Sequence, residues 1–236
     1  MEILYEDNHI IVVNKPQGIG SQPDKTGDKD LLTMVKEYIK EKYNKPGEAY
    51  VGLIHRLDRP TGGAIVFAKT SKAAARLSEQ LRDGDFDKKY LTVVCGKPRE
   101  QKGKIVSWLK KDERNNVVKI VPQTTNGAKR AELDYEVLEY NEETDHSLLR
   151  VKLYSGRGHQ IRVQMQSIKC PVFGDQKYGG EKMPKLMLNL FASELSFSHP
   201  VTKQKLIFRV YPPETVAAWN EFNIEKHLAL TTNVDD

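Results

Sequence analysis

The stretch HRLDRPTGGAIVFA, residues 55–68, decides how this chain folds. Its last five residues form an unbroken apolar run of the kind that makes a buried strand. The part before them cannot continue a strand or a helix, because a proline and two glycines interrupt it. Since residues 51–55 are also mainly apolar, the sequence predicts a loop held between two buried segments. Reactive side chains are commonly presented on such loops.

Outward from this loop, segments of alternating polarity are interspersed with segments of helical period. Asp30 is placed to cap one helix and Ser71 another, since each precedes apolar residues at helical spacing. The predicted elements are strands at 2–5, 10–14, 64–68, 90–94, 188–197 and 204–211, antiparallel hairpins over 104–154, helices after residues 30 and 71 and over 159–167, and a C-terminal helix from about Glu214. This order predicts an α+β fold, in which a mainly antiparallel mixed sheet is bent or split into two lobes around a central cleft and flanked by helices.

The composition is that of a globular protein with a mild excess of positive charge. The 236 residues carry 37 Lys+Arg against 32 Asp+Glu, a formal charge of +5. A chain of this length can bury a core without a disulfide or a metal. We expect one domain over residues 1–230 and a frayed tail at 231–236. The charge is compatible with an anionic partner but does not identify one.

The sequence shows no targeting or cofactor signature. The N-terminal residues lack the basic start and apolar stretch of a signal peptide, and no apolar run approaches bilayer length, so we expect a cytoplasmic protein. Cys95 and Cys170 have no metal-ligand spacing and are expected to be small core residues. Without a phosphate-binding loop or a dinucleotide fingerprint, we expect no cofactor and no metal. We also expect a monomer, because no apolar heptad is left over.

The loop at 55–63 carries the first candidate for chemistry. Asp58 lies between Arg56 and Arg59, and the two cations would favour its ionised form. An ionised carboxylate can act as a nucleophile or a base. The glycines that follow would let another backbone or a substrate approach closely. A purely structural alternative is a local turn in which Asp58 is salt-bridged to an arginine.

A second candidate cluster is SGRGHQIRVQ, residues 155–164. If a helix begins near residue 159, His159, Arg162 and Gln166 share one face. A fixed cation and two hydrogen-bonding groups would then lie beside a helix N-terminus, which attracts anions. The alternative is a solvated polar face opposite the apolar Ile161 and Met165.

Both clusters resemble motifs of the RluA-type pseudouridine synthases. Residues 55–63 resemble the catalytic motif of that family, and residues 156–163 resemble its arginine motif. Further matches are an N-terminal signature at 5–18, a tyrosine segment at 88–90, Pro171 with Gly174-Asp175 and Tyr178-Gly179, and a late strand at 195–200. The matches follow in order over roughly residues 3–212. The resemblance therefore implies the pseudouridine synthase fold, as a catalytic domain with no appended RNA-binding domain.

The resemblance also implies a reaction and a role for each residue. Asp58 would be the nucleophile that allows a uridine in ribosomal or transfer RNA to be isomerised to pseudouridine. Tyr90 would stack on the target uracil and assist proton removal from C5, and Arg162 would pair with Asp58. Arg56, with His55, would help to displace the target nucleotide from its stack. The expected RNA contacts are His55, Arg56, Arg157, His159 and Gln160.

The chain departs from the family pattern at four positions. Gly62 stands where serine is frequent, Gly158 where threonine is usual, and Gln164 and Phe191 where histidine is common. None of the four carries a role in the chemistry. They bear on substrate choice and on fine positioning.

Two other functions fit parts of the pattern. An inactive RNA-binding or RNA-chaperone protein could share the fold, although Asp58, Tyr90 and Arg162 are all present. A glycoside-type hydrolase would need a second acid beside Asp58, for which Glu79 or Asp83 are the candidates. Analysis of the products separates the three, as isomerised uridine, unchanged RNA or released base.

Overall fold

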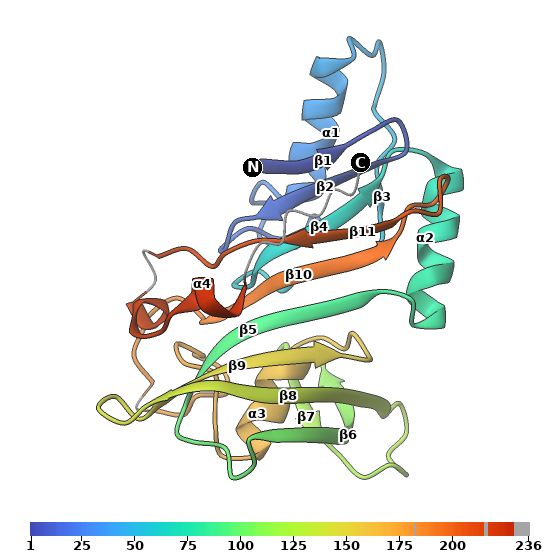
Figure 1. Cartoon of the computed structure of the whole chain (residues 1–236). Coiled ribbons are helices and arrows are strands. Elements are labelled where there is room, and N and C mark those ends of the chain that lie inside the picture. Colours follow the sequence, from blue (N-terminus) through green and yellow to red (C-terminus); the bar gives the residue numbers. More distant parts are fainter. Residues whose placement is uncertain (182, 215–216, 229–236) are drawn as a thin grey trace. The chain divides into compact units, whose positions relative to one another are not determined.

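A computed structural model describes residues 1–181, 183–214 and 217–228 (Figure 1). The chain forms two compact units, one of residues 1–89 and 190–210 and the other of residues 90–189 and 211–236. Neither unit is a contiguous segment, so each depends on contacts between distant parts of the chain. The predicted α+β class with a mainly antiparallel sheet is confirmed, and the central cleft stays a prediction.

The first unit joins N-terminal and late strands in one sheet (Figure 1). Its hydrogen-bonded order is β1-β2-β4-β10, with β3 beside β4 and β11 beside β10. All pairs are antiparallel except β4 with β10, which run parallel where Gly62 and Gly63 meet Phe191 and Ala192. The strands are β1 Glu2–Glu6, β2 Ile10–Lys15, β3 Gly52–Leu53, β4 Gly62–Ala68, β10 Leu190–Ser198 and β11 Lys205–Arg209.

Two helices belong to this unit. α1, Leu31–Lys42, begins where the sequence predicted, because the Asp30 side chain accepts a hydrogen bond from the backbone N–H of Thr33. α2, Ser71–Asp83, is capped one residue earlier than predicted. Thr70, in extended conformation, accepts from the N–H of Ala73, so Ser71 is the first helical residue and not the cap.

The second unit is a mainly antiparallel sheet with short helices from two parts of the chain. Its order is β5-β9-β8-β6-β7, which confirms the hairpins predicted over 104–154. The elements are β5 Asp87–Cys95, which starts in the first unit, β6 Lys102–Asp112, β7 Val117–Ile120, β8 Lys129–Asn141, β9 His146–Leu153 and α3 Gln160–Ser167. The core under α3 contains Leu109, Val118, Ala131, Val163 and Tyr178.

The predicted C-terminal helix from Glu214 is wrong. The chain forms a 3-10 turn, η1 Ala217–Glu221, and then a four-residue helix, α4 Ile224–His227. The break falls at Asn223, whose side chain caps α4 by accepting from the N–H of Lys226. Residues 231–236, the predicted frayed tail, lie outside the described residues. None of the described helices is long and apolar enough to cross a membrane.

Candidate active site

Asp58 lies in the first unit, in the segment between β3 and β4. The backbone carbonyl of Asp58 accepts from the N–H of Thr61 at 2.9 Å, which closes a tight turn. On the N-terminal side of Asp58, the Ser21 hydroxyl accepts from the N–H of Leu57 (3.0 Å) and donates to its carbonyl (2.8 Å). The residue before Asp58 is therefore held at both of its backbone polar groups.

The C-terminal side of Asp58 is held by Lys15, which has no exposed surface. The Lys15 ammonium donates to the carbonyls of Pro16 (3.1 Å), Arg59 (3.2 Å) and Thr61 (2.8 Å). Burial lowers the pKa of Lys15 to about 8, while the negative charge of Asp58 acts in the opposite direction. In the sequence, Lys15 was part of the N-terminal motif but was given no role. Its contact with the Thr61 carbonyl spans 46 residues and leaves no local pattern.

The guanidinium of Arg59, one of the two flanking cations that the sequence suggested for Asp58, is bound by side chains of another loop. Its guanidinium donates to Asp24 (2.7 Å), Asp28 (2.9 Å) and Thr26 (2.8 Å) in the loop between β2 and α1. The structural alternative, in which Asp58 lies in a local turn and is salt-bridged to an arginine, stays a prediction, while the turn itself is closed by the Asp58 carbonyl and the N–H of Thr61. Arg56 is exposed and stays a candidate RNA contact.

His55 is placed as a structural residue. Its Nε2 accepts from the backbone N–H of Val66 at 3.3 Å, and its ring packs edge-on against Phe86 with centroids 6.1 Å apart. Burial, and after it the positive charge of Lys88, lowers the pKa of His55 to about 3. His55 is thus neutral at physiological pH and cannot attract a phosphate as a cation. We leave it out of the RNA contacts proposed below.

In the second unit, α3 presents Arg162 from a buried position. The Arg162 Nε and Nη2 each donate to one oxygen of Asp175 at 2.7 Å, a bidentate pair with Asp175 fully buried. Asp175 Oδ1 also accepts from the N–H groups of Lys177 (2.9 Å) and Tyr178 (3.1 Å). The guanidinium lies 5.1 Å from the centroid of the Tyr178 ring. Arg162 is therefore fixed in orientation by Asp175 and Tyr178.

The role of Asp175 was missed in the sequence, where it appeared only as part of a motif. The signal available was an aspartate followed by two backbone N–H groups in a turn, which is a common carboxylate arrangement. Nothing local pointed to Arg162 as its partner, 13 residues away.

The sequence grouped His159, Arg162 and Gln166 on one polar face of α3, and this grouping is wrong. Gln166 is exposed, whereas Gln160, Arg162 and Gln164 are buried, so the alternative of a solvated face is wrong as well. The helix begins at Gln160, after His159 in left-handed conformation with φ 53°. Six consecutive buried residues leave no polar stripe for solvent.

The other predicted contacts near α3 divide into two kinds. Gln160 links the turn before α3 to β8, because its Oε1 accepts from Ser155 Oγ (2.8 Å) and its Nε2 donates to the carbonyl of Glu132 (3.0 Å). His159 Nδ1 is hydrogen-bonded to Tyr178 Oη at 2.7 Å. Arg157 is exposed, with Nε donating to a backbone carbonyl. Arg157 and His159 thus remain candidates to touch RNA, while both ends of the Gln160 side chain serve the fold.

Tyr90 is buried on β5, two residues after Lys88. Asp58 belongs to the first unit, and Tyr90 and Arg162 belong to the second. That the three residues act together is part of the proposal below.

Two of the departures from the family pattern, Gly62 and Phe191, depend on each other. A Cβ atom on Gly62 would lie 2.6 Å from the ring of Phe191, which sits opposite it in the β4–β10 register. Serine at position 62 and phenylalanine at position 191 are therefore incompatible without movement. Next to them, Gly63 has φ +119°, and a Cβ there would meet the Ala192 carbonyl oxygen at 2.3 Å, so only glycine fits. The structure gives no reason for Gly158, which faces open space.

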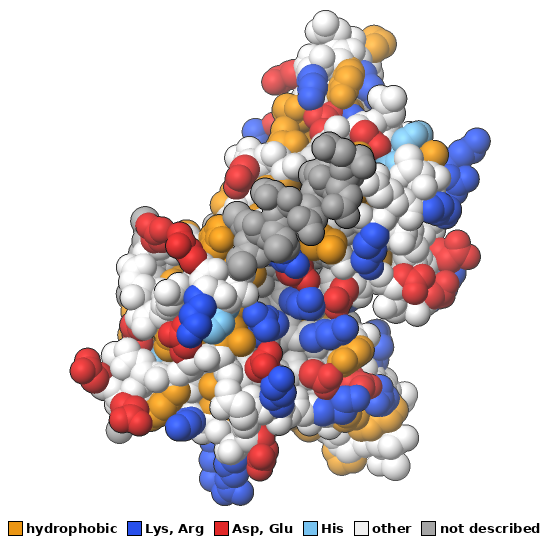
Figure 2. Space-filling view, in the orientation of Figure 1, with side chains coloured by type: hydrophobic (Ala, Val, Ile, Leu, Met, Phe, Trp, Pro, Cys, Tyr) orange, Lys and Arg blue, Asp and Glu red, His pale blue; other side chains and the backbone are white. Residues whose placement is uncertain are grey.

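The excess of basic residues does not form a one-signed patch on the outer side of β6 and β8. Glu132 there binds Lys104 and Arg130, and Glu136 binds Lys102 and Arg150. Each of these two carboxylates binds two cations, so acids are interspersed with the basic residues here, although the four cations outnumber the two acids. Figure 2 shows acidic and basic side chains interspersed on the face that it draws.

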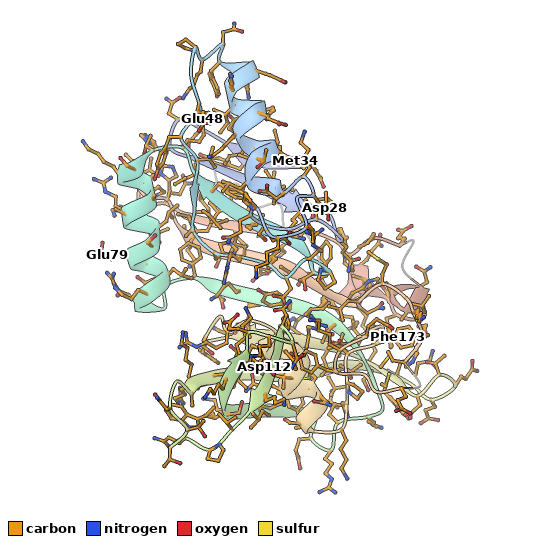
Figure 3. The ribbon with its side chains drawn as sticks, turned by 180° about the vertical axis from the view of Figure 1, so that it is seen from behind. Asp28, Met34, Glu48, Glu79, Asp112 and Phe173 are labelled. Carbon is orange, nitrogen blue, oxygen red and sulfur yellow. The ribbon has the colours of Figure 1, made fainter. Side chains whose placement is uncertain are left out.

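The two acids of the hydrolase alternative lie at the surface. Glu79 and Asp83 are both exposed on α2, and Figure 3 labels Glu79 on the outer side of that helix. Among the described residues, no group of three or more His, Cys, Asp or Glu side chains could hold a metal ion.

Comparison with known sequences identifies the family. The RNA pseudouridylate synthase model matches residues 9–167, which include Asp58, Tyr90 and Arg162. The chain belongs to this family. Its members are RNA-modifying isomerases, so the chain is an RNA pseudouridine synthase. An uncharacterized RNA pseudouridine synthase of Bacillus subtilis is 35% identical over 208 residues, which cover 88% of this chain and 67% of the relative.

Two other members of the pseudouridine synthase family extend the comparison. Ribosomal large subunit pseudouridine synthase D of Borreliella burgdorferi is 32% identical over 228 residues, covering 93% of this chain and 68% of that protein. The structure of human RNA pseudouridylate synthase domain containing 4 superposes with a TM-score of 0.74 over 90% of this chain and 89% of the human chain. At 22% identity that likeness shows the shared fold.

Proposed function

We propose that this pseudouridine synthase acts on ribosomal RNA and that Asp58 is its nucleophile. The observation that carries the proposal is the way Asp58 is presented. Leu57, Arg59 and Thr61 are each fixed through their backbone by Ser21 or Lys15. A catalytic group held this firmly is preorganised for reaction. Several relatives are named for the large ribosomal subunit, which favours ribosomal RNA as substrate.

The reaction breaks the bond from C1′ to N1 of uridine and forms one from C1′ to C5. In the proposed mechanism the Asp58 carboxylate adds to the sugar or takes its C2′ proton, as carboxylates trap or stabilise oxocarbenium character in glycosidases. The uracil turns within the site and C5 bonds to C1′, which displaces the Asp58 carboxylate from the sugar or, in the second case, is accompanied by return of the proton from Asp58 to C2′. The C5 proton passes to solvent and N1 takes up a proton, so atoms and charge balance and no redox partner is required.

Tyr90 and Arg162 complete the proposed site. The Tyr90 ring would stack on the uracil, which offsets part of the few kcal/mol needed to unstack it, and its hydroxyl would assist removal of the C5 proton. Arg162 would orient Asp58 through the edge of the guanidinium opposite to the one that Asp175 holds. The proposed RNA contacts are Arg56, Arg157 and His159. We further propose that the enzyme works as a monomer in the cytoplasm, without a cofactor.

A map of pseudouridine in total RNA tests the function. Cells lacking the gene are compared with cells that carry either the wild-type gene or Asp58→Asn. We expect one or more ribosomal sites to disappear on deletion and to return with the wild-type gene alone. If deletion removed pseudouridine only from transfer RNA, the proposal of ribosomal RNA as the substrate would be wrong. An unchanged map would favour the inactive RNA-binding protein.

A further inference from the structure

Residues 24–28, here called the acidic turn, lie in the loop between β2 and α1 and close around one guanidinium. Arg59 Nη2 donates to Asp24 Oδ2 (2.7 Å) and Thr26 Oγ1 (2.8 Å), and Nη1 donates to Asp28 Oδ2 (2.9 Å). Figure 3 labels Asp28 in this loop. The three acceptors come from within five residues, 31 to 35 positions away from Arg59.

The acidic turn is itself ordered by internal bonds. Asp24 Oδ1 accepts from the backbone N–H of Thr26 (2.9 Å) and from its hydroxyl (2.6 Å). The Thr26 hydroxyl can therefore donate to Asp24 while accepting from Arg59. A planar guanidinium bound by two carboxylates and a hydroxyl has one orientation, which a flexible ammonium in its place would not keep.

The backbone of Arg59 is held at the same time. Its carbonyl accepts from the N–H of Gly18 (2.9 Å) and from Lys15 Nζ (3.2 Å). Arg59 is thus fixed by both its side chain and its main chain, and the residue it follows is Asp58. Because Arg59 and Asp58 share a planar peptide unit, holding the Arg59 backbone also restricts the main chain that carries the Asp58 carboxylate.

We propose that Asp24, Thr26 and Asp28 are positioning residues for Asp58 that act through Arg59. The inference rests on the proposed role of Asp58 as nucleophile. It assigns Arg59 to the enzyme's own scaffold and not to the RNA backbone, since two carboxylates already neutralise the guanidinium and would repel a phosphate. The side chains of Arg59, Asp24 and Asp28 are 34%, 43% and 61% exposed, so they lie at the surface where RNA could compete.

Three variants separate the positioning role from RNA binding: Arg59→Met, the double variant Asp24→Asn with Asp28→Asn, and their combination. kcat and KM are measured by release of tritium from C5 of uridine in the RNA substrate. If the acidic turn positions Asp58, both parent variants lower kcat by about 10-fold or more, with KM within about twofold. The combination is then no worse than Arg59→Met, because the variants remove one shared interaction.

Direct binding of RNA by Arg59 would give a different kinetic pattern. If Arg59 binds RNA, Arg59→Met raises KM, whereas removing the two acids frees the guanidinium and lowers KM. That pattern, or unchanged kinetics in the variants, overturns the proposal. Glu37→Gln is the control, because it removes one acid from an exposed pair with Lys29 that does not touch the 57–61 segment. Arg59→Lys should recover only part of kcat.

Hydrogen exchange gives a readout that does not depend on activity. In Arg59→Met, the backbone N–H groups of Gly18 and Thr61 should exchange faster than in wild type, while those of α2 should be unchanged. All the altered side chains are at least partly exposed, and thermal unfolding checks that each variant folds. Faster exchange in a protein that forms no pseudouridine would uphold the contact and reject the function. Unchanged exchange would reject the contact itself.

Discussion

Replacing Lys15 by methionine should lower kcat strongly while leaving most of the stability. Methionine keeps an unbranched apolar stem but lacks the ammonium that donates to the carbonyls of Pro16, Arg59 and Thr61. Three bonds from a charged donor contribute about 1.5–3 kcal/mol each. Burying the ammonium costs several kcal/mol in turn. The two terms largely cancel, so we expect the free energy of unfolding to change by about 2 kcal/mol or less.

The effect on kcat should be much larger than the effect on stability. Without Lys15, the carbonyls on the C-terminal side of Asp58 lose their common donor, and the turn can shift. A displacement of about 1 Å in a catalytic group costs about 100-fold in rate. We therefore expect kcat to fall by about 100-fold, equivalent to about 2.7 kcal/mol. Single-turnover release of C5 tritium measures the rate, and urea unfolding measures the stability.

Lys69→Met is the matched control. Lys69 is also buried, but it donates to Glu6 (2.6 Å), the Asp7 carbonyl (2.5 Å) and Tyr43 Oη (3.1 Å), away from the Asp58 turn. Its loss weakens a carboxylate pair, so stability should fall by about 2 kcal/mol while kcat is kept. If Lys15→Met keeps kcat within about threefold of wild type, or if both variants lose activity alike, the role given to Lys15 is refuted.

Because of the lowered pKa of Lys15, a rise in pH should increase the stability and decrease kcat. Its pKa of about 8 in the folded protein lies below the ordinary value of 10.5. Between these values the unfolded chain binds the extra proton, so the contribution of Lys15 to the free energy of unfolding rises with pH. The neutral amine has one N–H fewer for its three acceptors, so kcat should fall as the pH passes 8. Lys15→Met should lack this alkaline limb.

Three further variants test other parts of the account. Arg162→Met should abolish turnover and destabilise the protein by about 3–5 kcal/mol, because it leaves Asp175 buried without its partner. Arg157→Met should do neither. Equal effects of the two variants in kinetic and thermal assays would contradict the role given to Arg162. Tyr90→Leu should weaken RNA binding in a filter assay more than Tyr90→Phe, with both lowering kcat; full activity of the Phe variant would exclude the hydroxyl. As a single variant, Gly62→Ser should lower the melting temperature, because the Phe191 ring occupies the space of the serine side chain. Adding Phe191→His should restore the melting temperature; a further loss in the double variant, equal to the sum of the two single losses, would disprove that coupling.

Local patterns in the sequence predicted most of the elements. The alternation of β6, β8 and β9, the apolar run of β4 and the Asp30 cap depend on residues within a few positions of one another, and each was found where expected. The errors were also local. Thr70 and Ser71 are both good caps, so the pattern could not choose between them. The C-terminal helix failed because Asn223 starts a second helix in place of continuing the first.

The contacts that organise the candidate site could not be read from the sequence. Lys15 binds carbonyls 44 and 46 residues away, and Arg59 binds Asp24 across 35. Asp175 binds Arg162 from a separate loop. The sequence named Arg59 only as a cation that flanks Asp58, without its partners Asp24 and Asp28, and it left Asp175 without a role. His55 was grouped with the RNA contacts because neither its hydrogen bond to the N–H of Val66 nor the lowering of its pKa by burial can be seen in the sequence.

The measurement that tests the central claim most directly is single-turnover C5-tritium release by wild type and Asp58→Asn. The substrate is a short stem-loop that contains the uridine located by the RNA map, with a chelator present and no nucleotide added. Wild type should release the tritium and leave pseudouridine in RNA of otherwise unchanged mass. Asp58→Asn, which keeps the shape of the side chain but not its charge or nucleophilicity, should release less than about 1% as fast and unfold at the same temperature. Retention of more than a few per cent of the wild-type rate by Asp58→Asn, or free uracil among the wild-type products, would contradict the account.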